Sequence, residues 1–116
     1  LKLSNNLNLF SSDANTIIFN DIKSEIVKSN QFIKVDFNLL INNILKELNK
    51  QKIQSLIVEG GRKTLQSFID NNIWDEARIF TAKKLLNKGL ESPIIRGKIK
   101  LKEDIGTDKL EIIINK

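Results

Sequence analysis

The sequence predicts an α/β fold in which a mixed sheet is flanked by helices and finished by antiparallel strands at the C-terminal end. Short apolar runs alternate with segments whose apolar residues recur at helical spacing. The largely apolar run 55–58 is typical of a parallel strand covered on both faces. Segments 99–103 and 110–114, joined by a turn that contains Gly106, are typical of a β-hairpin. This succession of elements is the α/β pattern.

Three further strands are predicted, two before and one after the 55–58 run, and one segment is left open. Residues 16–19 combine β-branched and aromatic side chains and predict a buried strand. Residues 31–36 alternate roughly between apolar and polar and predict a second, less buried strand. Residues 21–30 between them are compatible with a loop or a helical turn. Residues 75–82 predict another strand, with a helix continuing through Leu86 as the alternative.

Two helices are expected. From position 37 or 38 to about 50, apolar residues recur at steps of three and four, and Asp36 or Asn38 is available as the N-cap. In segment 62–72, three apolar residues share one face, and two consecutive asparagines end the helix. Each helix therefore has one face for burial and one for water.

The residue types that are absent exclude several mechanisms. The chain has no histidine, cysteine, methionine or tyrosine. It therefore offers no disulfide, no thiolate or imidazole metal site and no cysteine nucleophile, and we expect no metal. Any catalysis must use carboxylates, lysines, hydroxyls, the backbone or a cofactor. With no cysteine, no signal peptide and no apolar run near the ~18 residues of a membrane span, we expect a cytoplasmic protein without membrane contact.

Length and charge narrow the organisation and the partners. A chain of 116 residues has room for one core, so residues 1–116 are expected to form a single domain. It begins with Leu1 instead of methionine, which predicts a fragment of a longer protein. The net charge is +5, but acidic residues are interleaved with the lysines and no basic block occurs. We therefore expect no nucleic-acid partner, and a basic anion-binding or nucleic-acid-binding module remains an alternative.

The candidate site lies where the 55–58 run meets the second helix. Gly60 and Gly61 allow a tight turn and leave no Cβ beside the N–H groups of the helix N-terminus, which favour a phosphate. Arg62, Lys63 and Thr64 follow in the first turn, where cations oppose the helix dipole unless an anion is bound. Ordinary turn chemistry and solvated surface charges are the alternatives.

Glu59 immediately precedes the two glycines. A carboxylate at the end of an apolar run is either solvated at the sheet edge or directed into the cleft where ligands of such sheets bind. The residues themselves leave both possibilities open.

The motif around these residues resembles a known family. Segments 58–61, 67–69 and 74–80, together with Leu65, are similar to the carboxy-terminal half of the riboflavin-biosynthesis reductase domain, the 5-amino-6-(5-phosphoribosylamino)uracil reductase. That domain has a dihydrofolate-reductase-like fold and usually follows a zinc-dependent deaminase. The chain departs from the family pattern in the loop after the strand 75–82, where lysine replaces proline at position 83 and Asn87 replaces glycine.

The resemblance implies a function and roles for the residues of the site. It implies hydride transfer from NADPH to the ribosyl group of the aminouracil phosphate, with the pyrophosphate held by Gly60, Gly61 and the backbone of the first helical turn. Glu59 would face the substrate and the nicotinamide. Asp75 and Glu76 match the family pattern, although their place favours a structural role at the start of a strand.

The resemblance also implies an incomplete domain. Its N-terminal part, with the substrate-phosphate contacts, would lie upstream, so this fragment alone is expected to be inactive. We expect a homodimer, the common default for such domains. Another dihydrofolate-reductase-like NADPH reductase, with a different pyrimidine or pterin substrate, is the alternative within enzymes.

Overall fold

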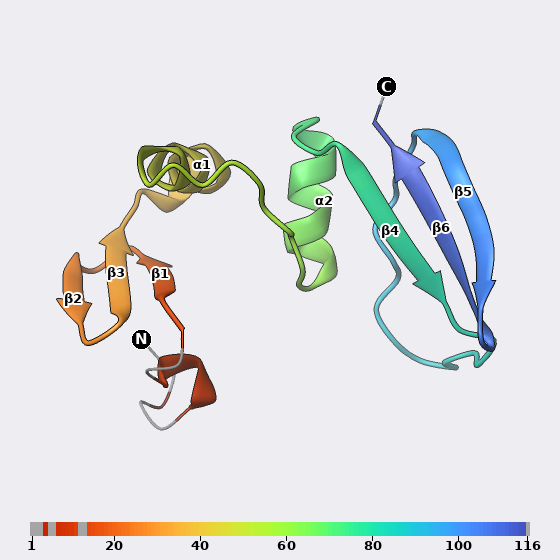
Figure 1. Ribbon diagram of the computed structural model, residues 1–116, viewed down its shortest axis with the longest axis horizontal. Helices are drawn as coiled ribbons and strands as arrows, with labels where there is room; N and C mark the ends of the chain where they lie inside the picture. The colour runs from red at the N-terminus through yellow and green to blue at the C-terminus, as the bar shows by residue number, and fades with distance from the viewer. Residues whose placement is uncertain (1–3, 5–6, 12–13, 116) are drawn as a thin grey trace. The chain divides into compact units, whose positions relative to one another are not determined.

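The computed structural model describes residues 4, 7–11 and 14–115 (Figure 1). The chain divides into two compact units, Leu1–Leu56 and Ile57–Lys116, and each is described by itself.

Unit 1 holds a small mixed sheet. Its elements are the 3-10 helix η1 (Asn8–Phe10), strands β1 (Thr16–Asn20), β2 (Glu25–Val27) and β3 (Asn30–Lys34), the 3-10 helix η2 (Phe37–Leu39) and helix α1 (Leu40–Lys50). The strand order is β1-β3-β2, with β1 parallel and β2 antiparallel to β3. Both strands predicted in this half are therefore confirmed, but the expected order of burial is wrong: β3, the middle strand, is more buried than β1.

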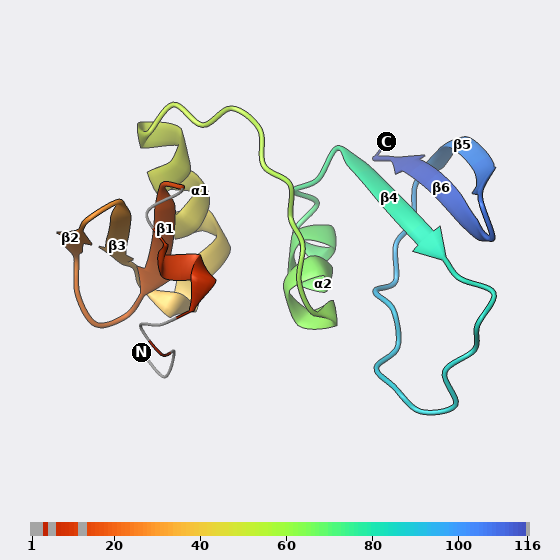
Figure 2. The same cartoon turned by 60° about the horizontal axis from the view of Figure 1, so that its bottom comes forward.

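Helix α1 lies against one side of this sheet (Figures 1 and 2). Its last turn buries Leu48, and the sheet side contributes the buried Ile33 and Val35. Of the two N-caps considered, Asp36 is used: its carboxylate accepts a hydrogen bond from the Asn38 amide at 2.9 Å. The cap begins η2, and the α-helical turns follow from Leu40. The predicted helix is confirmed with this 3-10 start.

Strand β2 occupies part of the segment that the sequence left open. The turn after β1 is built by the Asn20 side chain, whose oxygen accepts from the Ile22 and Lys23 amides at 2.9 and 2.8 Å. A two-residue turn, with Lys28 at φ 56°, then joins β2 to β3. Because this turn contains no glycine, the sequence lacks the usual hairpin signal.

Unit 2 holds an antiparallel sheet and one helix. Its elements are α2 (Arg62–Asp70), β4 (Glu76–Thr81), β5 (Lys98–Ile105) and β6 (Asp108–Ile114), and the strand order is β4-β6-β5. The sheet excludes the helical alternative for residues 75–86 and confirms the hairpin, whose turn places Gly106 at φ 62°. Strand β6 is the middle strand and supplies the buried Leu110 and Ile113.

The predicted strand at 55–58 is wrong for this structure. Segment 55–58 carries no strand, and among the described strands none pairs with it. Leu56 and Ile57 are 48% and 87% exposed. An apolar run becomes a strand only when neighbouring strands satisfy its backbone groups, and the boundary between the two units falls inside this run.

The mixed α/β fold class is confirmed, with the strands distributed over two three-stranded sheets. Within the described part of the chain, no helix is both long enough and apolar enough to cross a membrane.

Candidate functional site

The candidate site is the turn that leads into α2. Gly60 has φ 146°, a conformation that side-chain-bearing residues rarely adopt, and it redirects the chain into the helix. Gly61, at φ −71° and ψ 163°, is the N-cap residue, and its carbonyl oxygen accepts from the amides of Thr64 at 3.0 Å and Leu65 at 3.3 Å. The two glycines therefore have different roles. Position 60 requires glycine because of its positive φ, and Gly61 is the residue from which the helix starts.

The N-terminus of α2 is open. No side chain caps it, and a Cβ built on Gly61 would meet no atom within 4 Å. The N–H groups of a first helical turn lack partners within the helix and carry the positive end of its dipole. The space beside Gly61 is open, and the free N–H groups of a helix N-terminus favour an anion there.

The structure brings the predicted residues together at this one end of α2. Lys63 and Thr64 are exposed, and the Thr64 side chain lies beside Gly60, 3.7 Å from where a Cβ on that glycine would be. Arg62 is already engaged: its Nη1 is 2.9 Å from Oε2 of Glu91. Glu59 is exposed directly before the turn.

Two residues of the loop between β4 and β5 belong to the surroundings of the site and were missed by sequence reasoning. Glu91 pairs with Arg62, and the backbone of Ile94 pairs with the Gln66 side chain (Figure 2 shows the loop). These contacts join residues 28 and 29 positions apart. No local pattern signals such a contact; the one hint was the unexplained cation at the start of α2.

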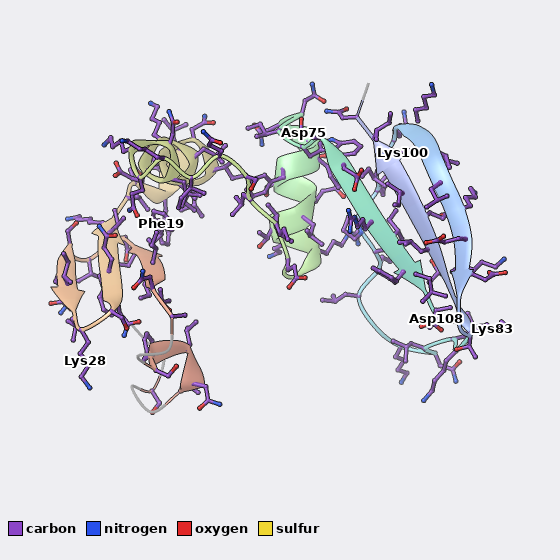
Figure 3. The ribbon with its side chains drawn as sticks, in the orientation of Figure 1. Phe19, Lys28, Asp75, Lys83, Lys100 and Asp108 are labelled. Carbon is purple, nitrogen blue, oxygen red and sulfur yellow. The ribbon has the colours of Figure 1, made fainter. Side chains whose placement is uncertain are left out.

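Glu76 has a structural role, as its position at the start of a strand indicated. Its carboxylate binds Nε of Arg78 at 3.0 Å and Nζ of Lys100 on β5 at 3.2 Å (Figure 3 labels Lys100). Hydrogen bonds first from Arg78 and then from Lys100 hold the pKa of the Glu76 carboxyl below its usual value. The neighbouring Asp75 contributes its carbonyl oxygen, which accepts from the Asn115 amide at 2.9 Å.

Comparison with known proteins identifies the class. Residues 1–110 match the family described as the RibD C-terminal domain, and the chain belongs to this family. A curated relative, "Riboflavin biosynthesis protein RibD" of Aquifex aeolicus (strain VF5), is 44% identical over 54 residues. The aligned segment covers 47% of this chain and 15% of that protein. The family resemblance carried by the residues around Glu59–Gly61 is thereby confirmed.

Proposed function

We propose that the chain is the cofactor-binding half of an NADPH-dependent reductase of riboflavin biosynthesis. The substrate is 5-amino-6-(5-phosphoribosylamino)uracil, whose ribosyl group is reduced to the ribityl form. The observation that carries this proposal is the open, glycine-lined N-terminus of α2 in a member of the RibD C-terminal domain family.

The glycine turn is the pyrophosphate site in this proposal. Gly61 leaves room for the phosphates to approach the backbone, and the first-turn amides of α2 donate to them. Lys63 adds positive charge from the exposed face, and Thr64 offers a hydroxyl beside the turn. NADPH supplies the hydride when bound, so the protein's own contribution is binding, orientation and electrostatics.

Glu59 is assigned to the substrate side. A carboxylate next to a pyrophosphate is repelled by it, so the Glu59 side chain turns towards neutral groups whose hydroxyls can donate to it. Glu59 directly precedes the turn, and in this assignment its side chain faces the substrate and the nicotinamide ring instead of the pyrophosphate.

Replacing Gly61 with valine tests the proposal. The side chain would occupy the space that the phosphates need, so NADPH affinity of the full-length protein should fall at least ~10-fold, about 1.4 kcal/mol. The fold should survive, because Gly61 has an ordinary φ and open space around it. Gly89→Val is the matched control, since a Cβ at Gly89 also meets open space. An unchanged dissociation constant in folded Gly61→Val would place the cofactor elsewhere.

We also propose that the protein works as a homodimer in the cytoplasm. The support is general: symmetric dimers are the commonest assemblies of soluble proteins. Sedimentation velocity of the full-length protein checks the oligomeric state, and a monomer at all accessible concentrations would contradict it.

A further inference from the structure

Two side chains of α2 hold the same loop. Arg62 and Gln66 are one helical turn apart and therefore lie on one face of the helix. Arg62 pairs with Glu91 at 2.9 Å. The Gln66 amide makes two hydrogen bonds with the backbone of Ile94, accepting from its N–H at 2.8 Å and donating to its carbonyl oxygen at 3.2 Å. The loop between β4 and β5 is thus attached to α2 at two points.

The two attachments differ in kind. The Gln66 contact satisfies both backbone polar groups of Ile94, its N–H and its carbonyl oxygen. The Arg62–Glu91 contact is an ion pair between side chains that are 36% and 83% exposed, and such pairs are weakened by water and salt. The loop before Glu91 is held loosely, because Leu85, Leu86 and Leu90 are 79% to 90% exposed. The Arg62–Glu91 ion pair is therefore the weaker of the two attachments and the first to break.

Arg62 is the first residue of α2 and stands at the opening where the proposed pyrophosphate binds. A guanidinium presents the same fork of N–H groups to a carboxylate and to a phosphate. Glu91 holds Nη1 of this fork in the structure described, so a phosphate that binds the fork through Nη1 has to displace the carboxylate.

We propose that Glu91 competes with the cofactor phosphates for Arg62. This inference rests on the proposed function of the glycine turn. Phosphate binding transfers Arg62 from Glu91 to the ligand and frees the loop around Glu91, while Gln66 retains Ile94. Glu91 thus lowers the affinity of the glycine turn for anions. It also links the attachment of the loop between β4 and β5 to whether a phosphate is bound.

Titration with inorganic pyrophosphate and with NADPH tests the competition. Because an exposed ion pair is weak, Glu91→Gln should tighten binding by roughly two- to fivefold. Glu103→Gln is the control: it removes one exposed carboxylate of β5 and changes the net charge equally. In an Arg62→Gln background, Glu91→Gln should have no effect, because the two residues act as a pair.

NMR order parameters and hydrogen exchange give a second readout that a merely structural ion pair would not move. Saturating pyrophosphate should lower the order parameters of the backbone amides in the loop up to Glu91, while Gln66 keeps the Ile94 amide protected from exchange. Equal affinities for Glu91→Gln and Glu103→Gln, or tightening that persists without Arg62, would refute the competition while leaving the phosphate site intact. Failure of the unaltered protein to bind either ligand would instead remove the site itself, and the competition with it.

Discussion

Gly97 allows the end of β6 and the turn before β4 to pack closely against the backbone, because it has no side chain. A Cβ at this position would lie 2.5 Å from the carbonyl oxygen of Ile114 and 3.0 Å from the ring of Trp74. The adjoining Asn115 side chain donates to Asn72 at 2.8 Å and to the Trp74 carbonyl oxygen at 2.9 Å. Close backbone approach and these hydrogen bonds together fix the end of α2 to β6.

Gly97→Ala should therefore destabilise unit 2. The added methyl group meets backbone, which cannot move aside as a flexible side chain could, and overpacking of this kind costs about 1–3 kcal/mol. Urea denaturation followed by the fluorescence of Trp74 measures the change. Gly89→Ala, at a position with open space, should be nearly neutral. Equal stability of the two variants would contradict the close packing at Gly97.

Glu59→Gln distinguishes the substrate side from the cofactor side. The variant keeps the size of the side chain and removes its charge. In the full-length enzyme kcat/KM for the substrate should fall by ~10- to 1000-fold, roughly 1.4–4 kcal/mol, while NADPH affinity changes by a factor of a few. Normal turnover with altered NADPH affinity would assign Glu59 to the cofactor, and no change in either would return it to a solvated position.

Individual elements differ in how far the sequence determined them. Helix α2 and the β5–β6 hairpin carry local signals, namely apolar spacing, a glycine before the helix and Gly106 in the turn, and both formed as predicted. The run 55–58 has strand composition but found no partner strand, because pairing is a property of the surrounding fold. Strand β2 was missed because its turn lacks glycine.

The same distinction holds for the candidate site. The glycine turn and the first turn of α2 were predictable, because all of their residues are neighbours in sequence. The pairing of Arg62 with Glu91 was not, because it depends on the path of a long loop. Prediction was thus successful where a property is local and failed where a distant partner completes it.

The sheet of unit 2 should lose stability in acid through Glu76. Its pKa is held below the ordinary value of 4.5 by Arg78 and Lys100, so the folded state binds this proton less readily than the unfolded chain. The stabilisation is present above that value and is lost as the pH falls through the lowered pKa of the folded state. Urea midpoints between about pH 6 and 3 should fall less for Glu76→Gln than for the unaltered protein. Glu103→Gln is the control, and its urea midpoint should fall with pH as that of the unaltered protein does. An equally steep fall for Glu76→Gln would contradict the role of Glu76.

For the whole molecule, family membership and the open helix terminus support the same proposal from independent directions. The match over residues 1–110 extends across both compact units, whereas the proposed phosphate site lies within one of them, on residues 60–64. The curated relative extends well beyond the region that this chain aligns with. Binding at the glycine turn is accordingly the part of the proposal that depends on this chain's own residues.

An NMR titration of the isotope-labelled protein with NADPH tests that binding most directly. We expect saturable shifts of the backbone amides of residues 60–64, centred on Gly61, because the phosphates accept from these N–H groups. In folded Gly61→Val these shifts should need at least ~10-fold more NADPH to reach half of their maximum. Saturable shifts confined to other residues, or no shifts from an intact protein, would contradict cofactor binding at the glycine turn.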